Sequence, residues 1–217
     1  TGVQTCALPI SRERGAGVIL FYGAHLLRNG AALLLERLMA GGWVTHLATN
    51  GAGTIHDWEY AWLGRSTESV EQYVAKGSFG AWDETGRNIH LALLAGALNG
   101  EGYGQSLGRY IAEDGADFPT KATLRDEITS NPNHPLTAAR ADLLSAMEHH
   151  NIPEGRLKVE HRWKHASILA SAHKNNVPMT VHPGIGYDII ANHPIFNGAA
   201  IGPAADRKST RLNSSHT

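Results

Sequence analysis

The stretch from Trp43 to Leu63 constrains the fold more than any other part of the chain. Apolar and β-branched residues up to Thr49 predict a strand, and the small residues at 50–53 then require the backbone to turn. Thr54 and Asp57 have the spacing of a capping box, so a helix is predicted to begin there. A strand, a glycine-containing corner and a helix start direct free backbone N–H groups at one place, which favours an anion such as a phosphate. The same residues are also typical of a plain strand-to-helix turn, because TNGAG is not the GxGxxG pattern.

Two other predicted strands end in corners of the same kind. The apolar run Gly15–Tyr22 predicts a strand buried on both faces, followed by a corner at Gly23–His25 and a helix over Leu26–Met39. Val177–Val181 predicts a short buried strand that ends in a third corner, His182–Gly186. Strands that alternate with helices indicate an α/β fold with a mainly parallel sheet, in which ligands lie outside the carboxyl ends of the strands. We therefore expect the three corners to lie together and to line a pocket.

The middle of the chain is mostly helical in pattern. Amphipathic segments separated by glycine predict helices over Trp82–Asn99, Tyr103–Glu113, Leu136–Glu148 and His161–Lys174. Phe118–Pro135 is polar and contains three prolines, which predicts a loop or a lid. No internal repeat and no low-complexity linker occurs, so one domain is expected.

The two ends of the chain are related to each other. One choice of codons for Thr1–Ile10 (ACT GGA GTT CAG ACG TGT GCT CTT CCG ATC) has a reverse complement that translates as DRKSTRLNSS, the sequence of Asp206–Ser215. Because natural protein ends have no reason to encode each other's complementary strand, we interpret 1–10 and 206–217 as translated sequencing adaptor. We expect both ends to pack poorly, and we assign the natural, partial domain to 11–205. The only cysteine, Cys6, belongs to the adaptor and carries no information on disulfides.

Composition excludes few classes of protein. A hydrophobic fraction of 42% with 18% charged residues is ordinary for a globular domain. The net charge of −1 gives no indication of binding to nucleic acid. No apolar run approaches the roughly 20 residues of a membrane span, so no membrane contact is expected and a cytoplasmic location is the default interpretation.

A metal-dependent hydrolase is one alternative, because histidine is abundant. His161 and His165 are four residues apart on a predicted helix, a spacing that can place two imidazoles on one metal. No HExxH motif and no matching cysteine or carboxylate accompanies them, which favours solvent-exposed helix histidines and no metal site.

Four polar residues flank the corners and are candidates for substrate binding. His56 and Asp57 directly follow the second corner, so they would face the reaction space if that corner binds a cofactor, and they could orient an amine or move a proton. Asp57 could instead only cap its own helix. His182 and Asp188 flank the third corner in the same way.

Three segments, in order and spacing, resemble the deoxyhypusine synthase family, particularly its bacterial deoxyhypusine synthase-like branch. They are FYGAHLLRNG at 21–30, HLATNGAGTIHDWEYA at 46–61 and HKNNVPMTVHPGIGYDIIANHP at 173–194. The resemblance implies a Rossmann-like, three-layer fold with a mainly parallel sheet, truncated here at its C-terminus, and a homotetramer with active sites between subunits. It also implies an NAD-dependent transferase that removes a hydride from spermidine and passes an aminobutyl group, as an imine, to an enzyme lysine. That lysine delivers the group to a lysine of an acceptor protein or to another polyamine.

The resemblance assigns residues by position. It implies that NAD is bound by Gly23, Ala24, His25, Thr49, Asn50, Gly51, Ala52 and Gly53. It implies that the amine is bound near His56, Asp57, His182 and Asp188. His56 stands where the family has an acid, which weakens a site for a cation.

The motif that carries the family's nucleophile differs in this chain. The Trp-Gly-Lys motif is absent, and Lys164, which follows Trp163, lies on a predicted amphipathic helix in the wrong place. We therefore expect the nucleophilic lysine beyond Ala205 and expect this fragment to be inactive. A non-catalytic binding protein of the same fold is the other alternative.

Overall fold

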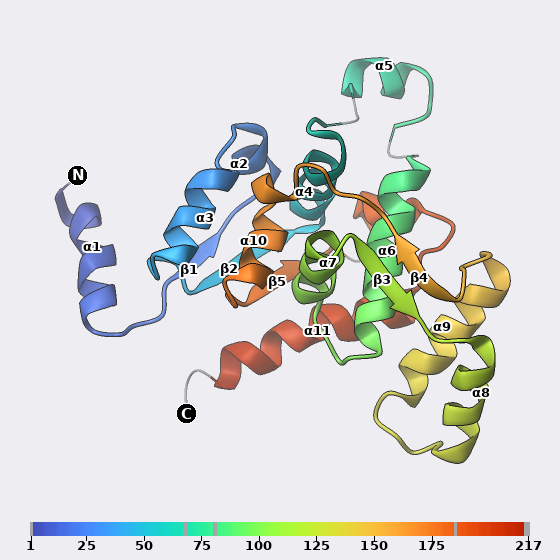
Figure 1. Ribbon diagram of the computed structural model, residues 1–217. Helices are drawn as coiled ribbons and strands as arrows, with labels where there is room; N and C mark the ends of the chain where they lie inside the picture. The colour runs from blue at the N-terminus through green and yellow to red at the C-terminus, as the bar shows by residue number, and fades with distance from the viewer. Residues whose placement is uncertain (1, 67–68, 80–81, 185, 215–217) are drawn as a thin grey trace.

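The computed structural model describes residues 2–66, 69–79, 82–184 and 186–214 and shows a mixed α/β fold (Figure 1). Three strands, β1 (Ile19–Phe21), β2 (His46–Asn50) and β5 (Met179–His182), form a parallel sheet in the order β1-β2-β5. The register pairs Leu20 with Leu47, and Leu47 with Met179. The prediction of an α/β fold with a mainly parallel sheet is confirmed for this central sheet.

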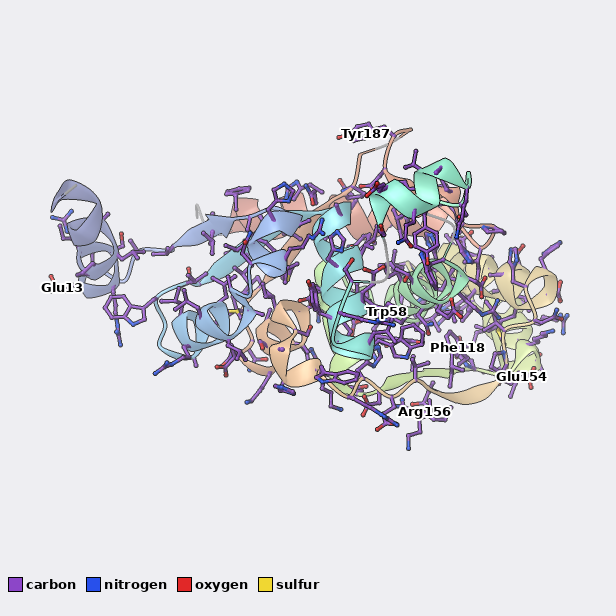
Figure 2. The ribbon with its side chains drawn as sticks, turned by 90° about the horizontal axis from the view of Figure 1, so that it is seen from above. Glu13, Trp58, Phe118, Glu154, Arg156 and Tyr187 are labelled. Atoms are coloured by element: carbon purple, nitrogen blue, oxygen red, sulfur yellow. The ribbon has the colours of Figure 1, made fainter. Side chains whose placement is uncertain are left out.

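Helices surround the sheet and continue beyond it. In chain order they are α1 (Gly2–Glu13), α2 (Ala24–Arg28), α3 (Ala32–Ala40), α4 (Gly51–Leu63), α5 (Val70–Ala75), α6 (Asp83–Ala97), α7 (Tyr103–Ala112), α8 (Lys121–Ser130), α9 (Thr137–His149), α10 (Ile168–Lys174) and α11 (Gly198–Ser214), with short 3₁₀ turns η1 (Lys164–Ala166) and η2 (Ile189–Asn192). The views of Figures 1 and 2 place α3, α7 and α10 on one face of the sheet and α11 on the other. Two further strands, β3 (Gly115–Phe118) and β4 (Gly155–Lys158), form an antiparallel pair beside α8 and α9.

Burial differs between the central strand and the edge of the sheet. Leu47 and Ala48 of β2 are buried, as expected for a strand covered on both faces. The prediction that Gly15–Tyr22 is buried on both faces is wrong, because β1 is an edge strand. Its outer residues Ile19 and Phe21 are 45% and 67% exposed.

The helix starts and breaks near the first two corners differ from the prediction. The expected single helix over Leu26–Met39 is two helices, because Gly30 between α2 and α3 adopts a left-handed conformation with φ of 78°. The expected helix start at Thr54 is also wrong. Helix α4 begins at Gly51, where the Asn50 side chain caps it by accepting a hydrogen bond from the Gly53 N–H at 3.0 Å.

In two later segments the secondary structure also differs from the prediction. The predicted loop or lid at Phe118–Pro135 contains α8, capped by Thr120, whose hydroxyl oxygen accepts from the Thr123 N–H at 3.0 Å. The predicted helix over His161–Lys174 is a 3₁₀ turn followed by α10, because Ser167 is extended and caps α10 instead of continuing a helix. The other three predicted helices are confirmed as α6, α7 and α9.

Two glycines bring α7 unusually close to its neighbours. Gly104 and Gly108 lie four residues apart and therefore on one face of α7. A Cβ atom on Gly104 would clash with the backbone carbonyl of Met179 in β5, and one on Gly108 would lie 2.6 Å from the Leu169 carbonyl oxygen in α10. Without side chains at these positions, α7 packs directly on the backbones of the sheet and of α10.

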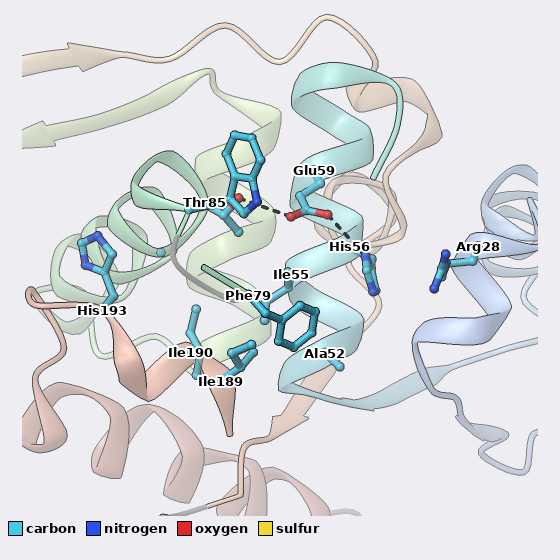
Figure 3. A pocket seen from close by; sticks show the side chains of 12 residues that line it. Arg28, Ala52, Ile55, His56, Glu59, Phe79, Thr85, Ile189, Ile190 and His193 are labelled. Carbon is cyan, nitrogen blue, oxygen red and sulfur yellow. Dashed lines mark hydrogen bonds and ion pairs between the residues drawn. The ribbon is translucent and has the colours of Figure 1, made fainter. Parts of the chain in front are cut away.

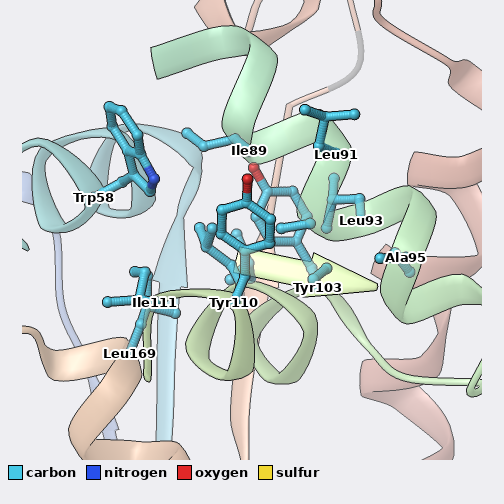
Figure 4. Packing of buried hydrophobic residues seen from close by; sticks show 14 of the residues in the cluster. Trp58, Ile89, Leu91, Leu93, Ala95, Tyr103, Tyr110, Ile111 and Leu169 are labelled. Atoms are coloured by element: carbon cyan, nitrogen blue, oxygen red, sulfur yellow. The ribbon is translucent and has the colours of Figure 1, made fainter. Parts of the chain in front are cut away.

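The largest buried side chains fill the space between α4, α6 and α7 (Figure 4). Trp58 comes from α4, Ile89 from α6, and Tyr103 and Tyr110 from α7. The hydroxyl of Tyr110 donates to the Asn88 side-chain oxygen at 2.7 Å, so this buried phenol keeps a partner. The core thus joins the helix that follows β2 to the two helices in the middle of the chain.

Two buried histidines make the stability of the fold depend on pH. Burial lowers the pKa of His90 to about 4, although its bond to the Ile190 carbonyl opposes the shift, and burial also lowers the pKa of His161 to about 4. In the unfolded chain both residues would bind a proton below pH about 6.5. Their contribution to stability is therefore complete above pH 6.5 and is lost as the pH falls toward 4. Asp57 acts in the opposite direction, because burial raises its pKa to about 6 and its share of stability is lost as the pH rises from 3.8 to 6.

Between pH 4 and pH 6 we expect the two histidines to change the free energy of unfolding more than the one aspartate does. Each group changes the free energy of unfolding by up to about 1.4 kcal/mol per pH unit. Since the aspartate cancels one of the two histidines, the unfolded chain binds about one proton more than the folded chain. Stability should therefore rise by about 2–3 kcal/mol between pH 4 and pH 6. Urea unfolding followed by circular dichroism at these two pH values measures the difference. In the His161→Phe variant the rise should largely disappear while stability at pH 7 is kept, because the ring still packs between Trp58 and Tyr110. An unchanged slope in that variant would contradict the assignment.

The N-terminal end of the chain packs poorly. Helix α1 extends away from the body of the molecule (Figures 1 and 2), and Leu8 and Ile10 are exposed, as the adaptor interpretation predicts, although the segment is helical. The first part of α11 precedes the predicted adaptor at 206–217 and packs on the core through Ala200, Ile201 and Ala204. None of the described helices is both long and apolar enough to cross a membrane.

Candidate functional site

The three predicted corners lie at one edge of the parallel sheet. Gly23 follows β1, Asn50 is the last residue of β2, and His182 is the last residue of β5. Because the strands are adjacent and parallel, their carboxyl ends meet. An open groove of about 460 Å³ touches all three corners. The prediction that the corners beginning at Gly23, Asn50 and His182 share one edge is confirmed.

Not all residues predicted to bind the cofactor reach this groove. Gly23, Thr49 and Asn50 line it, whereas Ala24 and His25 form the first turn of α2 and are not part of its lining. The Thr49 hydroxyl donates to the Tyr22 carbonyl at 2.9 Å, which ties the ends of β2 and β1 together. The remaining three predicted residues, Gly51, Ala52 and Gly53, form the first turn of α4.

A carboxylate of the chain itself lies at the start of α4. Asp188 approaches Gly51 so closely that a Cβ on this glycine would stand 2.6 Å from Asp188 Cγ. The Gly184 N–H donates to Asp188 Oδ2 at 3.2 Å and holds it there. The Asn50 side chain engages the Gly53 N–H, and Asp188 places a carboxylate beside Gly51, where a phosphate was expected. An anion at this position would require the segment around Asp188 to move.

Asp57 does not face the groove. It is fully buried and accepts hydrogen bonds from the Ser167 hydroxyl at 2.6 Å and from the N–H groups of Ile168 and Leu169 at 2.8 and 2.9 Å. Burial raises its pKa to about 6, and the three hydrogen bonds limit the rise. The prediction that Asp57 faces a substrate is wrong, and so is the alternative that it caps its own helix. Its carboxylate caps α10, a helix 110 residues further along the chain.

A second cavity, of about 240 Å³, lies along α4 next to the groove (Figure 3). Asn50 lines the groove and Ala52, two residues later, lines this pocket. Most of its wall is apolar, and its ionisable residues are Arg28 of α2, His56 and Glu59 of α4, and His193. The lining includes Arg28, Ile55, His56, Glu59, Phe79 and Ile190. Of the four predicted substrate residues, only His56 belongs to this pocket, while His182 lines the groove.

Glu59 is the acidic residue of the pocket, and the sequence reasoning missed it. It is 2% exposed, and its carboxylate accepts hydrogen bonds from the hydroxyls of Ser66 at 3.2 Å and Thr85 at 3.4 Å. His56 Nδ1 lies 3.3 Å from the same carboxylate. A spacing of three residues on a helix places His56 and Glu59 on one face, which is the signal that could have identified the pair. Glu59 therefore supplies an acidic group beside His56, one helical turn later.

The histidines that suggested a metal site are separated. His161 precedes η1 and is buried, whereas His165 lies within η1, so they do not share a helix face. His161 Nδ1 is 3.6 Å from Asp114 Oδ1, which is too long for a hydrogen bond. Over the described ranges, no three His, Cys, Asp or Glu side chains are grouped so that they could hold a metal ion.

Comparison with known proteins does not assign the site. No family model matches the chain, and no curated protein is similar to it. The resemblance of the three motif segments therefore stays a prediction.

Proposed function

We propose that this chain is part of a deoxyhypusine synthase-like, NAD-dependent transferase that takes an aminobutyl group from a polyamine. One observation carries the proposal: a groove at the carboxyl ends of three parallel strands adjoins an apolar pocket that contains a buried carboxylate. A groove of this kind suits a dinucleotide, and an apolar pocket with one acid suits an aliphatic amine.

The groove fits NAD in part. A Cβ on Gly23 would meet no atom within 4 Å, so this corner leaves room for a ligand against the backbone, and Thr49 and Asn50 complete the wall. The N-terminus of α4 is less favourable, because the Asp188 carboxylate would repel a phosphate. We propose that Gly23, Thr49, Asn50 and Ala52 hold the cofactor and that Asp188 moves aside. Bound NAD would accept a hydride from the carbon next to the amine nitrogen.

The pocket would hold the amine. Ile55, Phe79 and Ile190 offer an apolar wall to a methylene chain, and the Glu59 carboxylate offers a partner for an ammonium group. Lys164 donates to the Ala112 carbonyl and to Asp114, away from this pocket, so it is not proposed as the nucleophile. We propose that this chain binds ligands without completing a transfer.

The proposal includes a Rossmann-like arrangement and assembly into a homotetramer. Exposed apolar side chains on β1 and α3 support association, because a contact between subunits would cover them. They are Ile19, Phe21, Leu33 and Leu34. Light scattering after gel filtration tests the tetramer.

Binding experiments test the function directly. In isothermal titration calorimetry we expect the chain to bind NAD, and Gly23→Tyr to weaken this binding at least about tenfold by filling the groove. The same substitution at the exposed Gly198 of α11, outside the groove, is the matched control and should leave the affinity for NAD unchanged.

Spermidine should bind the unaltered chain, and Glu59→Gln should weaken this binding at least about tenfold. Glu160→Gln, at an exposed acid, should leave the affinity for spermidine unchanged. A chain that folds but shows no affinity for NAD would contradict the proposal.

A further inference from the structure

We infer that Glu59 fixes His56 in the one neutral form whose other ring nitrogen, Nε2, accepts a proton from a bound amine. The inference rests on the proposed function for the identity of the ligand, but its geometric part stands on the described residues alone. It assigns a positioning role to Glu59 and a proton-accepting role to His56.

Two polar atoms meet at one oxygen of the Glu59 carboxylate. His56 Nδ1 is 3.3 Å and Ser66 Oγ is 3.2 Å from Oε2, and these two atoms are 3.4 Å from each other. An ionised carboxylate can only accept hydrogen bonds, so both neighbours act as donors toward it. The Ser66–His56 distance is then the separation of two donors that share an acceptor. We therefore place the ring proton on Nδ1.

The opposite ring nitrogen has no hydrogen-bond partner among the described residues. With the proton on Nδ1, a neutral imidazole has its lone pair on Nε2. Nε2 makes no hydrogen bond to any residue that the structure describes, and the His56 side chain is 20% exposed where it lines the cavity. Figure 3 shows the ring between Glu59 and Arg28, with Glu59 on its Nδ1 side.

The other ionisable groups of the pocket are less suited to this role. His193 uses both ring nitrogens, since Nε2 lies 2.9 Å from Asp83 Oδ1 and Nδ1 accepts from the Ile195 N–H at 3.2 Å. Arg28 of α2 is a permanent cation and has no lone pair to offer. The Glu59 carboxylate can attract the ammonium by its charge, but it already accepts from Ser66, Thr85 and His56, so it is less well placed to take the proton. His56 is thus the residue of the lining that is arranged to accept a proton.

The proposed proton transfer needs only the bound ammonium group and His56. An N–H bond of the bound ammonium breaks, the proton goes to His56 Nε2, and the electron pair stays on the amine nitrogen. The product is a neutral amine beside an imidazolium, and the adjacent Glu59 carboxylate stabilises the new positive charge. A neutral amine nitrogen is the form that can supply electrons when a hydride leaves the neighbouring carbon.

Nitrogen NMR of the chain labelled with ¹⁵N-histidine tests the tautomer without NAD or amine present. At pH 8 we expect the His56 signals to show a protonated Nδ1 and an unprotonated Nε2, with the signals assigned by their loss in His56→Gln. In Glu59→Gln this preference should be lost and the ring should become a mixture of tautomers. In Ser66→Ala it should persist, because the carboxylate remains. Circular dichroism confirms that each variant is folded.

The opposite pattern overturns the inference. A protonated Nε2 in the unaltered chain would mean that Ser66 donates to Nδ1 and that Nε2 cannot accept. The same conclusion follows if Ser66→Ala, and not Glu59→Gln, abolishes the preference. Absence of spermidine binding in calorimetry combined with the expected tautomer would count against the proposed function alone, so the two failures are distinguishable.

Discussion

The Asp57→Ala variant is expected to lose about 3 kcal/mol of stability or more, which places it among the most damaging single substitutions in the chain. The change leaves the Ser167 hydroxyl and the N–H groups of Ile168 and Leu169 without partners in the interior. Each unsatisfied buried donor costs about 1–3 kcal/mol. Part of the loss is offset because the folded protein no longer holds a buried carboxylate whose pKa is raised to about 6. The urea midpoint at pH 7 measures the net effect.

Two further variants test whether the loss comes from the missing hydrogen bonds. One is at Asp57 and the other is a control at an exposed acid. Asp57→Asn keeps an oxygen that can accept from the start of α10, so it should lose less stability than the alanine variant. Asp117→Ala removes an acid of β3 whose side chain is 75% exposed, and it should stay within about 0.5 kcal/mol of the unaltered chain. If Asp57→Ala were as stable as Asp117→Ala, the role of Asp57 as the cap of α10 would be wrong.

Gly108→Val is the second substitution with a large expected effect. The new Cβ would lie 2.6 Å from the Leu169 carbonyl oxygen, and because both partners are helix backbones, neither can rotate away. Overpacking a well-packed interior costs about 1–3 kcal/mol and occasionally more. A branched side chain against a backbone carbonyl should reach the upper end of this range. Thermal unfolding should show a melting temperature lower by roughly 6–12 °C, the shift expected for a loss of about 3 kcal/mol in a domain of this size.

The control for this prediction is the same substitution at an open glycine. Gly198 begins α11, and a Cβ there would meet only the Phe196 ring, at an ordinary 3.7 Å. Gly198→Val should therefore leave the melting temperature nearly unchanged. A similar loss in both variants would mean that the valine side chain itself, and not the contact between α7 and α10, is responsible.

Much of the fold could be predicted because its signals are local. Hydrophobic periodicity between glycines identified α6, α7 and α9, and small residues after apolar runs identified the three corners at the sheet edge. The failures came from features that depend on partners far along the chain. Whether Gly15–Tyr22 is a central or an edge strand depends on which strands pair with it, and the short β4 is specified by its pairing with β3.

The positions of the loops at the candidate site could be predicted from sequence, but which side chains line the pocket was predicted less well. Sequence placed His56 correctly at a pocket, but it assigned the neighbouring acid to Asp57 instead of Glu59. Successive residues of a helix point in directions about 100° apart, so Asp57 faces α10 while His56 and Glu59 share a face. The position of Asp188 at the start of α4 could not be read from sequence, because the contact joins segments more than 130 residues apart.

The hydrogen bonds of Asp57 also have a kinetic consequence. They connect α4 to a segment 110 residues later, and the central strand β2 likewise pairs with the distant strand β5. Neither half of the chain can satisfy this carboxylate alone, so the β2–α4 unit should remain only partly ordered until the last third of the polypeptide has arrived. We therefore expect a slow, cooperative folding reaction, typical of proteins with many contacts between remote segments, and no stable subdomain that ends before Ser167.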